Sequence, residues 1–350
     1  MPFRIKVSLV IVALLVALVV IVPLVVPVGA PTGTRPLAEV VAQAARPDAG
    51  LVPAGAVELY AVQRPYSGPG TAPISFVLLH AYGSNAFSFD LVLDDLARYG
   101  DVVAFDRPGF GLSERPTPSA SGAGADPYSE AAQVEQTVAL IERLGLSDVV
   151  LVGDNAGGVL ALEVAIARPD LVAGLVLVGT PAYLLQQGGG APKWVLRTPQ
   201  LARLGPVFMR QLAGQPGEQL YAGAWFDASR ITPGQRAARS VGTTVEGWDA
   251  ALWQVTLAGA PRSLEGRLGG VVAPALVLVG AAAGSVPASE SERLAAELPS
   301  ATLEHLDACG DLPQEECPGQ FVDLVTTWLA DQGPAGARYT RPHGSAEETE

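Results

Sequence analysis

One ten-residue segment carries most of the information about the fold, and it reads Val149-Val150-Leu151-Val152-Gly153-Asp154-Asn155-Ala156-Gly157-Gly158. Its first four residues form a short apolar run typical of a buried strand, and the apolar residues from Gly157 to Ala167 favour a helix directly after it. Small residues stand two before and two after Asn155, which lets the backbone turn sharply. The segment therefore predicts a strand, a tight turn and a helix, with the Asn155 side chain directed into a pocket.

The same alternation continues on both sides of this segment. Further strands are expected at Ile74–Leu79, Asp101–Phe105, Leu175–Val178, Ala275–Val279 and Thr302–Leu306, and helices at Tyr128–Leu144, around Ser291–Leu298 and at Pro318–Leu329. Strands that alternate with helices in this way indicate an α/β fold with a doubly wound, mostly parallel sheet.

Composition excludes several classes of protein. Apolar residues make up 49% of the 350 residues and charged residues only 16%, so the chain is neither disordered nor a coiled coil. A net charge of −13 argues against nucleic acid and anionic lipid as partners, because phosphates would be repelled. Two cysteines are too few for a disulfide scaffold or a thiolate zinc site. We expect no metal and no cofactor.

The N-terminus resembles a membrane anchor. Basic residues Arg4 and Lys6 precede an apolar run over residues 7–28, which at about 1.5 Å per residue spans a bilayer core of about 30 Å. We expect a short cytoplasmic end at residues 1–6, a transmembrane helix at 7–28 and a body outside the cell membrane, as a single-pass protein. The alternative is a signal peptide cleaved near Ala30, which would make the protein secreted.

The rest of the chain divides into five parts by pattern. We expect a juxtamembrane linker at residues 29–56, with a short helix at 37–41, then a first part of the α/β core at 57–183. Helical patterns with four tryptophans indicate a cap at 184–270, placed over a pocket for a small hydrophobic ligand. The second part of the core follows at 271–331, and the tail at 332–350 is expected to be disordered.

Three motifs together resemble the α/β-hydrolase superfamily, in its capped branch of esterases, epoxide hydrolases and haloalkane dehalogenases. Residues 78–83 read Leu-Leu-His-Ala-Tyr-Gly, where the family has His-Gly-x-Gly. Residues 105–113 read Phe-Asp-Arg-Pro-Gly-Phe-Gly-Leu-Ser, and residues 153–157 form the family's nucleophile elbow. The resemblance covers residues 73–182 and 271–331, about half of the chain, and implies the α/β-hydrolase fold.

The family's mechanism needs a nucleophile on the elbow, an acid after a late strand and a histidine after the last strand. All three positions are substituted here. Asn155 stands at the elbow, and its carboxamide nitrogen is no useful nucleophile. Ala283 replaces the acid of Gly-x-x-Asp, and Asp311 replaces the histidine of Gly-His-x-Pro. The resemblance therefore implies that the Ser-His-Asp mechanism is absent.

No other residue is expected to substitute. The chain has three histidines: His80 belongs to the first motif and should pack beneath its loop, His305 lies inside the last strand, and His343 lies in the tail. Asp154 adjoins the apex of the elbow, and we expect it to be a hydrogen-bonded structural residue rather than a nucleophile.

Part of a binding site can survive without a nucleophile. The resemblance implies that the backbone N–H groups of Tyr82 and Ala156 form a pair of donors like an oxyanion hole. Ala81 replaces the family's glycine, which affects the conformation of that loop, because a Cβ disfavours positive φ. We predict that the Asn155 amide donates a hydrogen bond to the Asp311 carboxylate, directly or through one water.

The remaining features have mainly structural interpretations. Asp106 and Arg107 are expected to hold the second motif by hydrogen bonds, and Trp248 and Trp253 to pack within the cap. Cys309 and Cys317 flank the Asp311 turn and form either a disulfide or two free thiols. The neighbouring pair, Glu315 and Glu316, is a weak metal signal, and we expect a solvated approach to a helix instead.

Two classes of function remain open. The first is a membrane-anchored, catalytically inactive protein of the α/β-hydrolase fold that acts as a small-molecule-binding or scaffolding module; the sequence does not indicate a protein partner. The alternative is an active hydrolase of small hydrophobic esters or epoxides that uses non-standard residues. Whether the protein is an enzyme is therefore left to the geometry of the site.

Overall fold

The structure is a computed structural model that describes residues 21–25, 27–44, 46–72, 74–118, 126–183, 193–259, 262–282 and 284–332. Its centre is an eight-stranded sheet in the order β1-β2-β4-β3-β5-β6-β7-β8. The strands are β1 (Ala49–Ala54), β2 (Val57–Arg64), β3 (Ser75–Leu79), β4 (Asp101–Phe105), β5 (Val149–Asp154), β6 (Val172–Val178), β7 (Ala275–Gly280) and β8 (Ala301–Leu306). Only the β1–β2 and β2–β4 pairs are antiparallel, so the predicted mostly parallel sheet is confirmed.

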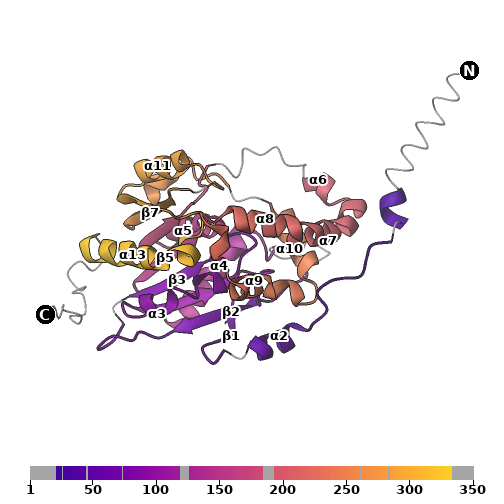
Figure 1. Ribbon diagram of the computed structural model, residues 1–350, viewed down its shortest axis with the longest axis horizontal. Helices are drawn as coiled ribbons and strands as arrows, with labels where there is room; N and C mark the ends of the chain where they lie inside the picture. Colours follow the sequence, from indigo (N-terminus) through magenta and orange to yellow (C-terminus); the bar gives the residue numbers. More distant parts are fainter. Residues whose placement is uncertain are drawn as a thin grey trace, which may run out of the picture.

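Helices cover both faces of the sheet (Figure 1). On one face, α4 (Glu130–Leu144), α5 (Ala156–Ala167) and α11 (Ala288–Glu297) pack against alternate residues of the strands. On the other, α3 (Leu93–Leu96) and α13 (Pro318–Gln332) pack against the residues between them. Every residue of β3 and β5 is buried, which explains why these strands are continuous apolar runs.

The cap lies between β6 and β7, where the insertion was predicted. It consists of α6 (Lys193–Leu196), α7 (Pro199–Ala213), α8 (Gln215–Gly223), η3 (Ala228–Arg230), α9 (Pro233–Ser240), η4 (Val241–Thr244) and α10 (Trp248–Ala258), followed by η5 (Leu268–Gly270). Helix α7 packs closely on α10, because Gly205 leaves room for the Trp253 ring. Trp248 and Trp253 are both buried, as predicted.

The N-terminal part of the core begins earlier than predicted. Helix α2 (Leu37–Ala44) includes the short helix expected at residues 37–41. Strand β1, however, starts at Ala49, inside the linker that we placed at residues 29–56, so that boundary is wrong. The reason is a hairpin: Ala54 pairs with Val57, and Gly55 takes the left-handed φ of +67° that the tight turn requires. The sequence did not indicate this strand, because it contains Pro53 and proline is uncommon inside strands.

The two ends of the chain are described only in part. Of the predicted anchor, residues 7–20 and 26 lie outside the described ranges, and residues 21–25 are helical. Within the ranges that are described, no helix is both long enough and apolar enough to cross a membrane. The tail from residue 333 onward, with His343, also lies outside them, so its predicted disorder remains a prediction.

The elbow depends on close packing between α5 and β3, which a stability measurement can test. A Cβ at Gly157 would lie 2.0 Å from the Leu79 carbonyl oxygen. We expect Gly157→Ala to lower the free energy of unfolding by about 1–3 kcal/mol, because overpacking forces the backbone to shift.

Gly50→Ala is the matched control, because no atom lies within 4 Å of the position a Cβ would take there. Denaturant unfolding of the full chain in mild detergent compares the two variants. A Gly157→Ala protein as stable as the wild type would contradict the tight packing.

Candidate functional site

The elbow holds Asn155 in a conformation that side chains rarely adopt. Its φ is +49° and its ψ is −111°, and its N–H donates to the Val178 carbonyl at 2.8 Å. The turn is sharp because glycines stand on both sides: a Cβ at Gly153 would lie 2.4 Å from the Gly158 Cα. This confirms the predicted strand, turn and helix with Asn155 at the apex.

The Asn155 carboxamide is bonded to its immediate surroundings. Its Nδ2 donates to the Gly179 carbonyl at 3.3 Å, and its Oδ1 accepts from the Ala156 N–H at 2.9 Å. We predicted that the Ala156 N–H would serve as an oxyanion-type donor. That prediction is wrong for this arrangement, because the Asn155 oxygen already occupies the donor.

The other predicted donor lies on the loop after β3. Among the hydrogen bonds of the described residues, none uses the Tyr82 N–H. Ala81 is not one of the described residues with positive φ; Gly83 takes that conformation instead, at +72°. Ala81 therefore puts no strain on this loop, because the positive φ falls at Gly83.

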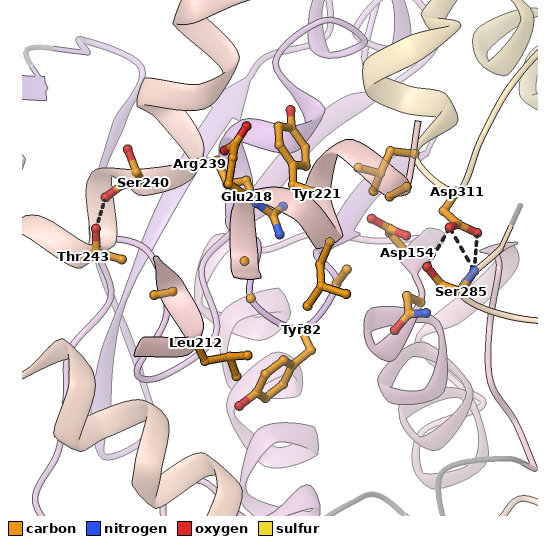
Figure 2. Close-up of a pocket in the computed structure, with 18 of the residues that line it drawn as sticks. Tyr82, Asp154, Leu212, Glu218, Tyr221, Arg239, Ser240, Thr243, Ser285 and Asp311 are labelled. Carbon is orange, nitrogen blue, oxygen red and sulfur yellow. Dashed lines mark hydrogen bonds between the residues drawn. The ribbon is translucent and has the colours of Figure 1, made fainter. Parts of the chain in front are cut away.

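Asp311 is held by the loop after β7 rather than by Asn155. Its carboxylate accepts from the Ser285 N–H at 3.1 Å and from the Ser285 Oγ at 2.6 Å (Figure 2). It also accepts from the Gly284 N–H at 3.3 Å. The predicted direct bond from Asn155 is absent from the hydrogen bonds of the described residues, because both groups have other partners. Asn155 and Asp311 nevertheless line the same cavity.

Sequence reasoning missed Ser285. Ala283, which we predicted to replace the family's acid, lies outside the described residues, and Ser285 follows it by two. The family pattern reads the acid at position 283, so nothing marked Ser285 in advance. Only the approach of the β7 and β8 loops brings its hydroxyl to Asp311.

Asp154 is a buried, hydrogen-bonded residue, as predicted. It is 1% exposed, and Gln314 Nε2 donates to its Oδ2 at 2.9 Å. Burial, together with the nearby charge of Glu315, raises the pKa of Asp154 to about 8. Burial also raises the pKa of Glu315 to about 7, although the Tyr221 hydroxyl donates to this carboxylate at 2.6 Å.

The two glutamates after Asp311 are not solvated, so that prediction is wrong. They lie on the short helix α12 (Pro313–Glu316), and Glu316 is 1% exposed. Its carboxylate accepts from the N–H groups of Phe226 and Asp227 in the cap, at 2.9 and 2.8 Å, and from Gly310 at 2.8 Å. The cap covers α12, which the local sequence could not reveal. The described residues contain no group of three or more metal-ligating side chains.

A disulfide joins Cys309 to Cys317, which decides between the two states that the sequence left open. The bridge closes the loop that contains Asp311 and α12. Both cysteines are buried. The loop that contains Asp311 is therefore fixed at both ends.

The histidines that the structure describes have structural positions. His80 is fully buried; its Nε2 accepts from the Arg107 N–H at 3.1 Å, so its Nδ1 carries the proton and donates to the Ala81 carbonyl at 2.7 Å. Burial and the Arg107 charge lower the pKa of His80 well below its usual value. His305 lies within β8, as predicted, and its side chain is exposed.

Asp106 and Arg107 hold the second motif, as predicted. The buried Asp106 carboxylate accepts from the N–H groups of Ala86 and Leu112, at 2.7 and 2.6 Å. Arg107 Nη1 donates to Gln133 at 3.3 Å, and its guanidinium lies 4.9 Å from the centre of the Phe110 ring.

A cavity of about 400 Å³ lies under the cap, above the elbow. The core contributes Asn155 and Asp311, and the cap contributes apolar side chains, Met209, Leu212, Leu220 and Leu252. Two arginines of α9 also line it. Arg236 pairs with Glu218, whereas Arg239 lies over the Tyr221 ring at 4.4 Å, and among the described residues no carboxylate stands at ion-pair distance from it (Figure 2).

Comparison with known proteins agrees with this geometry. Residues 74–318 match the family described as alpha/beta hydrolase fold. The chain is 29% identical to a 2-hydroxymuconate semialdehyde hydrolase of Pseudomonas putida, over 66% of this chain and 77% of that protein. It is 27% identical to a 2-hydroxy-6-oxononadienedioate/2-hydroxy-6-oxononatrienedioate hydrolase of Dechloromonas aromatica, over 77% and 91%. The crystal structure of an enol-lactonase from Burkholderia xenovorans superimposes with a TM-score of 0.64 at 19% identity, over 81% of this chain and 100% of that one.

The buried carboxyl groups predict a dependence of stability on pH. The pKa of Asp154 is about 8 in the folded chain and about 3.9 when unfolded, so the folded state holds the extra proton between these values. Stability from this group is therefore present at acidic pH and is lost as pH rises toward 8.

We expect Asp154→Asn to reduce that loss by up to about 1.4 kcal/mol per pH unit between pH 5 and 8, because an amide does not ionise. Denaturant unfolding as a function of pH measures the slope. The exposed Asp323→Asn on α13 is the control. Parallel pH profiles for Asp154→Asn and the wild type would show that Asp154 is ionised in the folded chain.

Proposed function

Because the chain belongs to the α/β-hydrolase fold family, we propose that it is a member that binds a small molecule under its cap without cleaving it, at the outer surface of the cell membrane. Hydrolases are its relatives, so loss of the reaction must be argued from the site itself.

One observation supports this proposal above all. The Asn155 carboxamide stands at the apex of the elbow, where the family has its nucleophile, and it also accepts the hydrogen bond of the neighbouring Ala156 N–H. Acyl transfer on this fold needs a nucleophile at the elbow and free N–H groups for the developing oxyanion. Asn155 has no nucleophilic atom, and its Oδ1 accepts from the Ala156 N–H at 2.9 Å. Both requirements are therefore unmet at the same residue.

Among the residues that the structure describes, no histidine stands where the reaction would need a general base. Asp311 stands at the position of the family's histidine, and its carboxylate is held by Ser285. His80 has hydrogen-bond partners on both ring nitrogens, and His305 does not line the cavity. The hydrogen bonds of Asp311 and His80 therefore go to neighbouring groups of the protein, and neither side chain is placed to transfer a proton at the elbow.

The cavity favours a mainly apolar ligand with one anionic group. Most of its cap side is apolar, and the Arg239 guanidinium lines it with no carboxylate of the described residues at ion-pair distance. A partly desolvated guanidinium is stabilised by an anion, and its planar donors suit a carboxylate. Two relatives are hydrolases named for a semialdehyde and for dioates, which agrees with a small carboxylate as ligand.

The membrane location is part of the proposal and rests on the sequence. Arg4 and Lys6 precede the apolar run at residues 7–28, which favours a single-pass anchor with the body outside. Cleavage near Ala30 would instead release the same body as a secreted protein. Alkaline extraction of membranes that contain the full chain separates the two, because only an anchored chain stays in the pellet.

A second candidate function is the hydrolysis of small hydrophobic esters or epoxides. The observation in its favour is the Ser285 hydroxyl, which donates to Asp311 at 2.6 Å in the same cavity. A carboxylate is a weaker base than histidine for a serine hydroxyl, so this pair alone is a poor nucleophile system.

We expect the full chain to show no labelling by a fluorophosphonate probe and no turnover of short acyl esters above background. Asn155→Ser should restore no measurable activity, because a serine without base or acid stays protonated. Mass spectrometry of the probe-treated protein locates any adduct. Labelling that disappears in Ser285→Ala would establish the second candidate and overturn the first.

The binding proposal has its own test, with 4-phenylbutyrate and its neutral amide as probes. We expect the carboxylate to bind more tightly in calorimetric titration, and Arg239→Gln to remove this preference, about tenfold or 1.4 kcal/mol. Arg236→Gln is the matched control, because Glu218 already pairs with that arginine. An unchanged preference in Arg239→Gln would contradict the assignment of Arg239 to the ligand's anion.

A further inference from the structure

The cap contains a segment whose charge is opposite to that of the whole chain. Residues 193–213, which form α6 and α7, include Lys193, Arg197, Arg203 and Arg210 and no acidic residue, whereas the chain as a whole has a net charge of −13. Charges farther away than about 8 Å are largely screened at physiological salt. Arg210 is paired with Asp249 at 3.0 Å and its side chain is only 11% exposed, so the exposed Arg197 and the half-buried Arg203 provide the positive charge that an approaching surface meets at this part of the cap.

The same segment exposes two large aromatic side chains. Trp194 on α6 is 74% exposed and Phe208 on α7 is 58% exposed. The opposite side of α7 is buried, with Gly205 against Trp253 and Met209 in the cavity wall. A basic, amphipathic helix with exposed Trp and Phe is typical of segments that lie in the interface of a bilayer.

The position of α7 in the molecule points to the same partner. Arg203 Nη1 donates to the Pro23 carbonyl at 3.1 Å, and Arg210 Nη1 donates to the carbonyls of Gly29 and Ala30 at 2.7 Å each. The last part of the predicted anchor, at Pro23, and the chain that follows it, at Gly29 and Ala30, are thus bonded to α7. Figure 1 shows the short N-terminal helix, in indigo, at the end of the molecule where α6 and α7 lie.

We propose that the α6–α7 face, defined by Trp194, Arg197 and Phe208, lies in the interface of an anionic lipid bilayer. This inference rests on the membrane anchor of the proposed function and goes beyond it, because it assigns a second contact and fixes which side of the body faces the lipid. Met209 and Leu212 of the same helix line the cavity, so the helix proposed to contact lipid also forms part of the cavity wall.

The distribution of tryptophans allows a direct test. Four of the five tryptophans, Trp225, Trp248, Trp253 and Trp328, are at most 6% exposed, so lipid can contact only Trp194. The full chain is reconstituted in nanodiscs of phosphatidylglycerol and phosphatidylcholine, with or without bromine on the acyl chains near the headgroup. We expect brominated lipid to quench about one fifth of the emission, one tryptophan of five, and Trp194→Phe to abolish the quenching.

A matched control places a tryptophan on the far side of the body. Val272 is 71% exposed and precedes the N-terminal end of β7, whereas the cap covers the C-terminal ends of the parallel strands. In the Trp194→Phe background, Val272→Trp should show no quenching. Quenching that is unchanged in Trp194→Phe, or equal for Val272→Trp, would overturn the proposed orientation.

Charge provides an independent readout. Arg197→Glu should reduce the quenching at least twofold in discs with phosphatidylglycerol and leave it unchanged in discs of phosphatidylcholine alone, because only the anionic lipid attracts the guanidinium. Discs that hold the chain but show no quenching would overturn this inference and leave the anchor intact. A chain that does not enter discs at all would overturn both the anchor and the inference.

Discussion

The close approach of α5 to the end of β3 constrains the whole upper side of this protein. A Cβ at Gly157 would lie 2.0 Å from the Leu79 carbonyl oxygen, so the helix can begin directly above the sheet only with glycine there. That placement forces the residue before the helix into the strained conformation seen at Asn155. The strain, which active hydrolases of this fold use to expose a nucleophile, is retained here for a carboxamide that bonds to its own neighbours.

The loop after β8 makes the second half of the site rigid. A disulfide closes it, Glu316 binds three backbone N–H groups, and the Asp311 N–H donates to the Ala224 carbonyl of the cap at 2.7 Å. The cap and the core are therefore joined through a buried network of carboxyl groups. Asp154 belongs to it as a group whose raised pKa keeps it protonated at neutral pH, which suits a structural acceptor and donor rather than a nucleophile.

The cap has two faces with different chemistry. Its inner face lines the cavity with apolar side chains and Arg239, and its outer face along α6 and α7 is basic and aromatic. Net charge describes encounters at long range, whereas contact with a bilayer depends on the charges within a Debye length of the contacting surface. The net charge of −13 is therefore compatible with the proposed contact between α6–α7 and lipid, and the cavity lies on the other side of α7.

The sequence by itself determined the sheet, the elbow and the cap insertion, because apolar periodicity and glycine spacing are local properties of the chain. The motifs of the family resemblance also indicated structural positions for Asp154 and His80, and both side chains are buried and hydrogen-bonded. Only the tertiary structure decided the partners: Ser285 for Asp311, the cap for Glu316, and the Ala156 N–H for Asn155. Some of these contacts join segments up to 90 residues apart, and the contact of Asn155 depends on how its side chain is rotated within one turn. Neither kind of contact produces a repeating pattern in the sequence.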